Sequence, residues 1–479
     1  MKKQVQILAA MCVMTACSIG VAIPSMAATK GWKQEGENWV YYEKDGSKVT
    51  GEWKKSGSHW FYLDDDGIML TSSLVESDDD VFYVNSVGAM VMNEWREVEN
   101  EDAGDEDEPD AYWYYFQSNG KAYKASSDRT TFRSIKKADG SLKKYAFDDD
   151  GRMLYGWVNE ESTRLTGDDA WKEGVYYCGE SDDGAQVIAS WAQIHVEDEE
   201  NEDDSDQDYW FYFNSSGKKT DDETKKINGK RYTFNEYGAA QYEWYQVATK
   251  QNASSSNSYQ YFNLPEQCWR ADGWFHVVPD EDVDQEAYND DEAYWFYAEK
   301  DGDLVKSQIK TINGKKYAFN DKGEMLEGLF KIEFEENSST KIASSTEIEN
   351  EEDLPDEFDS CEVFYFGNSP AGAIETGNTT LEVDGEVYAY SFQDSGSKKG
   401  AGYNGIHKNS IYIKGRKLKA DKEDKLKVVE YNDKEYLVNT SGTIAKNKKN
   451  VKDADENYYC TDKDGVVTYQ GTDKYEKEK

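Results

Sequence analysis

Aromatic residues recur along the chain in short clusters, and their rings are side chains well suited to hold a ligand. The segment 208–219, DYWFYFNSSGKK, carries five consecutive aromatic residues. The face of such a ring attracts a quaternary ammonium ion, and its apolar surface stacks on a sugar. A strand with one solvated face alternates apolar and polar residues; this cluster does not, so both faces of the predicted strand must be covered. Similar clusters occur at 112–121, 294–303 and 363–372.

The clusters belong to a short repeating unit, which indicates the elements that position them. The unit contains an aromatic triplet, a turn with Gly and a second strand, as in WVYYEKDGSKVTGEW at 39–53 and WFYLDDDGIMLTSSL at 60–74. Because KDG and DDDG supply the positive-φ positions of tight turns, we predict that each triplet forms a β-hairpin with the strand after its Gly turn. A second version with an ING start, at 225–244 and 310–330, predicts further hairpins.

Acidic inserts separate a Trp from the following triplet at 94–113, 190–210 and 273–295, where a hairpin turn of a few residues is expected. One interpretation is a solvated, flexible loop. A second is a calcium site, because hard cations take several carboxylate ligands, although no insert has the ordered loop with a central Gly and a terminal Glu. A third is a surface for a basic protein partner. The weak calcium candidates are Asp105, Asp107, Asp110, Asp280, Asp282 and Asp284.

The charge of the chain is strongly negative before residue 380. The net charge is −41, from 55 Lys and Arg against 96 Asp and Glu. Residues 380–479 are near neutral, and the Trp residues all precede them. Such a chain should repel nucleic acid and anionic membranes. An aromatic content of 14% suits small repeats that each bury a few large rings instead of one deep aliphatic core.

The N-terminus indicates export. MKKQVQILAAMCVMTACSIG has a basic start and an apolar stretch, and a cleavage site follows at Ser25-Met26-Ala27, so we interpret residues 1–28 as a secretory signal peptide. Lipid modification of Cys17 is the alternative. No later apolar run is long enough to span a membrane, so we expect a secreted chain that attaches non-covalently. The later cysteines are dispersed, which favours single thiols over a disulfide scaffold, with pairing left open; they are Cys178, Cys268, Cys361 and Cys460.

The sequence contains no recognisable catalytic motif. The four histidines fall in different repeats, and GxSxG, HExxH, Walker and CxxC patterns do not occur. The repeats also leave no contiguous segment for a separate catalytic domain. We therefore expect a protein that is not an enzyme.

The segment GWKQEGENWVYYEKDGSKVTGEW at 31–53 resembles the cell-wall-binding repeat family, which includes choline-binding modules, glucan-binding repeats and clostridial toxin repeats. KTINGKKYAFNDKGEMLEG, from 310, resembles the toxin-type variant. The resemblance implies stacked β-hairpins and a role in holding proteins on surface glycans or teichoic acids. The positions that match the family's aromatic cage are Trp32, Trp39, Tyr41, Trp53, Trp60 and Tyr62, and the later triplets add Trp113, Trp210 and Trp295. The acidic inserts depart from the family's short spacing.

These observations predict an all-β solenoid of stacked β-hairpin repeats with long acidic loop insertions. We expect a secreted, non-catalytic surface protein of a Gram-positive-type bacterium that binds choline-decorated teichoic acid or another wall glycan and needs no cofactor. The alternative is an adhesive or structural surface protein whose acidic loops bind calcium or a basic protein. The expected segments are the signal peptide at 1–28, family-like repeats at 29–95, repeats with acidic inserts at 96–330 and degenerate Trp-free repeats at 331–479.

Overall fold

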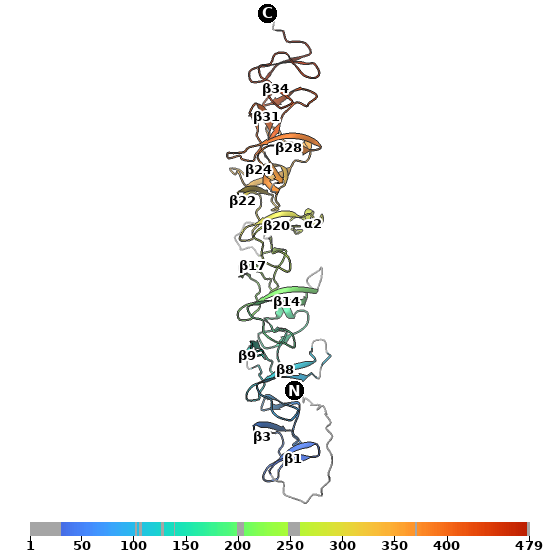
Figure 1. Ribbon diagram of the computed structural model, residues 1–479, viewed down its shortest axis with the longest axis vertical. Coiled ribbons are helices and arrows are strands. Elements are labelled where there is room, and N and C mark those ends of the chain that lie inside the picture. The colour runs from blue at the N-terminus through green and yellow to red at the C-terminus, as the bar shows by residue number, and fades with distance from the viewer. Residues whose placement is uncertain are drawn as a thin grey trace. The chain divides into compact units, whose positions relative to one another are not determined.

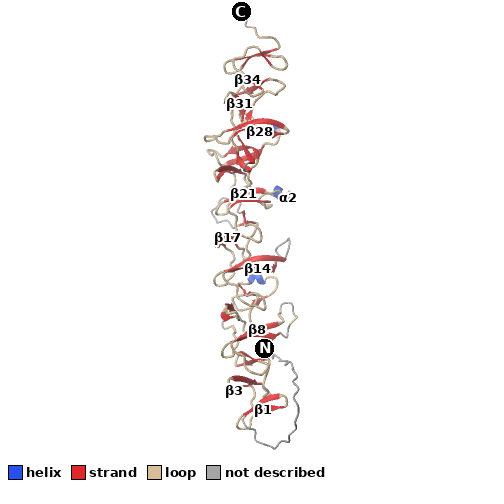
Figure 2. Cartoon of the chain, viewed as in Figure 1, coloured by secondary structure: helices blue, strands red, loops and turns tan. Residues whose placement is uncertain are grey.

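The computed structural model describes residues 30–100, 103–104, 108–125, 129–137, 139–198, 206–247, 259–368 and 371–476. The chain divides into two compact units, Met1–Gln241 and Tyr242–Lys479, and the division lies inside the segment 96–330. The described residues together consist of strands and turns with two short α-helices and one 3₁₀ turn (Figure 2). The predicted all-β fold of β-hairpins is confirmed.

Unit 1 is a succession of antiparallel two-stranded ladders, apart from one three-stranded sheet, and Figure 1 shows them following one another in chain order. Its elements are β1 (Gly31–Glu35), β2 (Asn38–Tyr42), β3 (Glu52–Ser56), β4 (His59–Leu63), β5 (Ser73–Ser77), β6 (Asp80–Val84), β7 (Glu94–Glu99), β8 (Ala111–Phe116), β9 (Arg133–Lys136), β10 (Leu142–Tyr145), β11 (Trp157–Val158), β12 (Arg164–Leu165), α1 (Ala170–Glu173), β13 (Tyr176–Tyr177), β14 (Ser190–Glu197), β15 (Asp206–Phe213), β16 (Thr224–Ile227) and β17 (Lys230–Thr233).

Unit 2 begins with similar ladders and then contains a four-stranded sheet, β25-β24-β26-β27, and a five-stranded sheet, β28-β29-β32-β31-β30. Its elements are β18 (Trp244–Gln246), β19 (Tyr259–Tyr261), β20 (Gly273–Val277), α2 (Gln285–Asn289), β21 (Tyr294–Ala298), β22 (Gln308–Ile312), β23 (Lys315–Phe319), β24 (Gly328–Phe334), β25 (Ile342–Glu347), η1 (Glu351–Asp353), β26 (Glu362–Asn368), β27 (Ala371–Ile374), β28 (Gly377–Val383), β29 (Glu386–Phe392), β30 (Gly405–His407), β31 (Ser410–Ile413), β32 (Arg416–Lys417), β33 (Leu426–Tyr431), β34 (Lys434–Asn439), β35 (Val451–Lys452), β36 (Tyr458–Thr461) and β37 (Val467–Gly471).

Each aromatic triplet pairs with the strand before it, and the prediction that it pairs with the strand after its Gly turn is wrong. In the first hairpin Trp32 lies opposite Tyr41, and the tight turn between β1 and β2 is Gly36-Glu37. The chain after the KDG turn returns only as a single bridge, between Tyr42 and Lys48. The ING-type hairpins are confirmed, since β16 pairs with β17 and β22 with β23.

The segment after each Gly turn joins one hairpin to the previous one. In the turn after β4, the Asp64 carboxylate accepts the backbone N–H of Ile68, 2.7 Å away, and Gly67 has φ of 74°. The next residue, Met69, donates its N–H to the carbonyl of Trp39 at 2.9 Å. The sequence predicts that backbone N–H groups after the Gly turn pair with the triplet of the same hairpin. In the structure the N–H of Met69 instead bonds to the preceding repeat.

Many of the turn glycines also make room for a side chain of the preceding repeat. A Cβ on Gly88 would lie 2.8 Å from Met69 Cε, closer than real Cβ contacts allow, and Gly88 has φ of 78°. Glycine is thus required both for backbone conformation and for close packing. We call this position of a side chain against the turn glycine of the next repeat its seat. The seat recurs for Lys48 at Gly67, Met90 at Gly120, Met153 at Gly184, Gln186 at Gly217 and Lys219 at Gly238 in unit 1, and for Met325 at Gly372 and Ile444 at Gly465 in unit 2.

The five consecutive aromatics of β15 cover both faces of the strand. Phe211 and Phe213 are fully buried in the interior of unit 1. Tyr212, on the opposite face, packs edge-on against Trp191 with ring centroids 5.1 Å apart. Trp191 in turn stacks on Phe234 of the next hairpin at 5.7 Å. One face of the strand lies in the core and the other packs partly against a neighbouring hairpin, which explains the missing alternation.

The acidic inserts lie at the hairpin tips, as predicted. In the third insert the chain forms α2, and the Asp282 carboxylate accepts the hydroxyl hydrogen of Tyr259. In the second, Tyr209 donates to Asp198 at 2.8 Å. For the third insert the flexible part of the loop interpretation is wrong at α2, which Asp284 caps, whereas most residues of the insert are exposed, as the solvated part of that interpretation predicts.

The single-thiol prediction for the four later cysteines is confirmed, since all four are free and buried. Burial raises the pKa of Cys178 to about 12. Within the described residues, no helix is long and apolar enough to cross a membrane.

Candidate functional site

The cross-strand register of the first hairpin places three large rings on one face. Trp32 of β1 lies directly opposite Tyr41 of β2. Trp39 precedes Tyr41 by two residues, so the two side chains point to the same face of the ladder. We call this arrangement a cage, made of a strand Trp (Trp32), a triplet Trp (Trp39) and a triplet Tyr (Tyr41).

Five hairpins share the cage register. The long inserts do not disturb it, because they begin beyond the positions that carry the rings. In sequence the inserts separate the strand Trp from the triplet Trp. Across the ladder the two residues nevertheless hold the same relative positions as in the first hairpin. The five sets are Trp32, Trp39 and Tyr41; Trp53, Trp60 and Tyr62; Trp95, Trp113 and Tyr115; Trp191, Trp210 and Tyr212; and Trp274, Trp295 and Tyr297. Sequence reasoning missed the strand Trp and triplet Tyr of the last three.

The rings of the last two cages stand at steep angles to one another. Trp274 and Trp295 have centroids 6.2 Å apart with planes at 86°, and Trp274 meets Tyr297 at 5.1 Å and 77°. In the preceding cage Trp191 and Trp210 lie 6.4 Å apart at 83°. Rings at right angles present their electron-rich faces from different directions, which is the arrangement that holds a cation.

The strand Trp and the triplet Trp have different roles. Trp32 also meets Phe61 of the next hairpin at 5.4 Å, so it packs two repeats together. Trp274 likewise meets Phe319 at 5.7 Å. The triplet Trp is exposed in two cages, with 43% of Trp39 and 38% of Trp295 accessible, and half-buried in the other three. In these two cages the ring of the triplet Trp is therefore the accessible one.

A methionine of the following repeat is hydrogen-bonded to the triplet Trp in four of the five cages. Its N–H donates to the triplet Trp carbonyl, at 2.8 Å for Met325 and Trp295. Its thioether is polarisable and packs well against rings. Sequence reasoning missed these residues, although a G-x-M pattern marks them: Met69, Met90, Met153 and Met325, with Ala240 in the remaining cage.

The residue opposite the triplet Trp differs between cages and changes the local charge. Glu97 lies opposite Trp113 and adds a carboxylate. Lys55 lies opposite Trp60 and places its ammonium 5.7 Å over that ring. His276 lies opposite Trp295, with ring centroids 4.9 Å apart. These differences predict unequal affinities for a cation.

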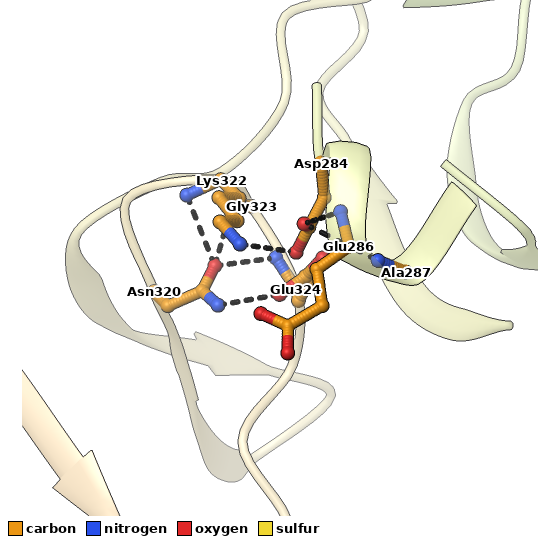
Figure 3. A network of polar contacts seen from close by, with 7 residues as sticks. All are labelled: Asp284, Glu286, Ala287, Asn320, Lys322, Gly323 and Glu324. Atoms are coloured by element: carbon orange, nitrogen blue, oxygen red, sulfur yellow. Dashed lines mark hydrogen bonds and ion pairs between the residues drawn. The ribbon is translucent and has the colours of Figure 1, made fainter. Parts of the chain in front are cut away.

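A polar network links the third insert to the turn that bears the Met325 methionine (Figure 3). Asp284 caps α2 by accepting the N–H groups of Glu286 at 3.1 Å and Ala287 at 3.4 Å, and it also pairs with Lys322. Glu324 is 5% exposed, and Asn320 donates to it at 2.6 Å.

The two carboxyl groups of this network, Asp284 and Glu324, have pKa values shifted in opposite directions. Burial, aided by the hydrogen bond to Asp284, raises the pKa of Glu324 to about 7. Burial opposes ionisation of Asp284 as well, but the hydrogen bonds from Lys322 and Glu324 hold its pKa below the usual value. Below about pH 7, therefore, Glu324 carries the proton and Asp284 the charge.

The described calcium candidates do not form one cluster, and three of their carboxylates accept hydrogen bonds within the protein. Asp105 and Asp107 lie outside the described residues. Asp110 is exposed, and its backbone carbonyl accepts the N–H of Asn100. Asp280 accepts the N–H of Asp282, and Asp282 and Asp284 are engaged as described above. Within the described residues, one cluster of three carboxylates is compact enough to share a cation. It lies in a Gly turn and consists of Asp148, Asp149 and Asp150.

Two segments match models of known repeats. Residues 29–72 match a choline-binding repeat and residues 111–122 match a putative cell wall binding repeat. The chain thus carries repeats of the cell-wall-binding type, as the sequence predicts. A search of curated proteins found no match.

Several solved structures from Streptococcus pneumoniae align with the chain. The modular autolysin LytC, solved with a synthetic peptidoglycan ligand, is 20% identical over 63% of this chain and 54% of its own, with a TM-score of 0.34. Choline binding protein F, solved with a peptidoglycan analogue, is 19% identical over 74% of this chain and all of its own, with a TM-score of 0.40. The choline-binding domain of CbpL is 21% identical over 45% of this chain and 90% of its own, with a TM-score of 0.29. The chain therefore spans about half the length of the autolysin.

Proposed function

We propose, from the repeats that the chain carries and the cages that they form, that this protein is a secreted, non-catalytic binder of cell-wall polymer and that choline groups of the polymer enter the cages. The observation that carries the proposal is the cage register, which recurs on five hairpins despite inserts of different length. A merely structural Trp needs no open partner ring, whereas Trp39 and Trp295 stay substantially exposed.

The physical basis is the attraction between ring faces and a quaternary ammonium ion. Each ring contact contributes about 0.5–2 kcal/mol, so a single cage binds choline weakly. Several weak sites on one chain bind a polymer with repeated choline groups far more tightly, because the later contacts are intramolecular. The five cages and a repetitive wall polymer suit each other in this respect.

The charge of the chain favours the same ligand. A net charge of −41 attracts cations towards the protein and repels nucleic acid. The long-range term is screened by salt, whereas the ring contacts inside a cage are screened less. Binding to choline should therefore persist at physiological ionic strength.

The test is retention of the secreted chain on purified cell walls, with parallel washes of choline, soluble glucan and EDTA. Release by choline supports the proposal. Release by glucan alone replaces choline with a sugar as the ligand of the aromatic surface. Release by EDTA alone moves binding to the acidic inserts, and no retention contradicts wall binding.

A further inference from the structure

A sixth repeat has the register of a cage but holds a cation of its own. We infer that Lys219 is a tethered ligand whose ammonium fills the cage position at Trp157, so that this repeat takes no external choline. The inference rests on the proposed function in treating a cage as a cation site. It adds that one repeat of unit 1 is permanently occupied by the chain itself.

The backbone establishes that the repeat is equivalent to the five cages. Trp157 lies opposite Tyr177, as Trp32 lies opposite Tyr41. Two residues before Tyr177 stands Val175, and its carbonyl accepts the N–H of Lys219 at 2.8 Å. This is the bond that Met69 makes to Trp39.

The side chain of Lys219 has the same seat as the methionines. A Cβ on Gly238 would lie 2.8 Å from Lys219 Cδ, just as one on Gly184 would lie 2.4 Å from Met153 Cε. A lysine side chain is one atom longer than methionine, and that atom is the ammonium. A single exchange of Met for Lys therefore places a charge where the methionines end.

The ammonium of Lys219 is surrounded by groups that hold a cation. Its Nζ lies 5.1 Å from the centroid of the Trp157 ring. It donates to the carbonyl of Trp171 at 2.5 Å and to that of Lys172 at 3.2 Å. Both carbonyls come from α1, which fills the side where Val175 replaces the triplet Trp. Ring face and carbonyl oxygens together supply the partners that a buried ammonium needs.

The site is closed to solvent, unlike the open cages. Lys219 and Trp157 are each 7% exposed, whereas the strand Trp in each of the five cages is half-buried. Burial lowers the pKa of Lys219 to about 8, so the ammonium form prevails at pH 7. The Trp157 ring is thus almost fully covered, with Lys219 beside it.

Chemical rescue of Lys219→Ala tests the inference. Alanine is tolerated at this position, because Ala240 occupies it in another repeat, and n-propylammonium replaces the deleted atoms. At pH 7 we expect n-propylammonium to raise the melting temperature of this variant saturably, or to restore its refolding if it is isolated unfolded. Neutral 1-propanol should do neither.

Two controls make the result specific. Lys219→Met fills the space of the lysine methylene groups, as Met153 does in its repeat, and should respond to neither compound. Lys226→Ala removes an exposed lysine from β16 and should behave like the unaltered protein. Equal effects of amine and alcohol on Lys219→Ala, or no effect of either, would overturn the inference. Because the readout is stability without choline, failure of wall binding in the unaltered protein is recognised separately.

Discussion

The indole rings of Trp274 and Trp295 stand almost perpendicular across one hairpin, with their centroids 6.2 Å apart and their planes at 86°. Both rings come from the β20–β21 ladder, in which Trp295 lies opposite His276 rather than opposite Trp274. The offset of one pleat lets the two rings meet at right angles instead of stacking flat. The same relationship joins Trp191 and Trp210, whose centroids lie 6.4 Å apart with planes at 83°, and in the proposed function it makes the ladder a ligand surface.

Removal of one triplet Trp should weaken one cage without unfolding the repeat. Trp295→Ala deletes an exposed ring, so we expect choline affinity at that cage to fall about 2- to 30-fold, corresponding to the loss of about 0.5–2 kcal/mol. Fluorine NMR of protein labelled with 5-fluorotryptophan follows single cages during a choline titration. Phe358→Ala, which removes a ring that is 74% exposed and belongs to no cage, is the matched control and should change no choline-dependent signal.

Replacement of a turn glycine should disrupt stacking more than replacement of a hairpin-tip glycine. Gly88 and Gly36 both have positive φ, but a Cβ meets Met69 only at Gly88 and finds open space at Gly36. Gly36→Ala should therefore cost only the backbone strain, about 1–2 kcal/mol, and Gly88→Ala should lower the free energy of unfolding further. Urea denaturation measures both. Equal losses would show that the methionine seat contributes nothing to stability.

The carboxyl pair at Asp284 and Glu324 should make stability depend on pH. The ordinary pKa of Glu324 is 4.5 and its folded value about 7, so the folded state holds the proton more tightly. Its contribution is full below pH 4.5 and is lost as the pH rises to about 7. Asp284 has the opposite shift, which affects stability only at lower pH.

Glu324→Gln should remove this dependence, because glutamine has no proton to lose. The measurement is the difference in the free energy of unfolding between the unaltered protein and the variant from pH 4.5 to 8, which cancels the titration of groups elsewhere. A difference that stays constant over that range would contradict the shared proton.

The buried thiols should be inert in the folded chain. Burial raises the pKa of Cys178 and of Cys268 to about 12, so neither forms a thiolate at pH 8. We expect a disulfide reagent such as Ellman's to react with them only after unfolding, and reduction to leave the melting temperature unchanged. Rapid reaction of the native protein would show that these repeats open readily.

Much of the fold could be predicted from the sequence, but the pairing of the strands could not. Two tight turns flank each triplet, such as Gly36-Glu37 and the KDG turn ending at Gly46, and both fit a hairpin. The choice depends on the next repeat, because Met69 uses its N–H to bind Trp39 instead of continuing a ladder. A contact between repeats is not encoded in local spacing.

The candidate site could be predicted only in part, because some of its residues come from a neighbouring repeat. The triplets indicated Trp39, Trp60 and their counterparts, since aromatic clusters are visible in sequence. The methionines and Lys219 come from the following repeat, and only the stacked structure brings Met325 to Trp295 or Lys219 to Trp157. The inserts also concealed the later cages until the register showed where each insert begins.

The central claim is that the cages select a quaternary ammonium ion, and calorimetric titration tests it most directly. Choline and its uncharged isostere 3,3-dimethyl-1-butanol have the same shape, so a difference between them reports the charge alone. We predict that choline binds the full chain and that the isostere binds far more weakly, with the difference reduced in Trp295→Ala. Equal binding of the two compounds, or no binding of choline, would contradict the account.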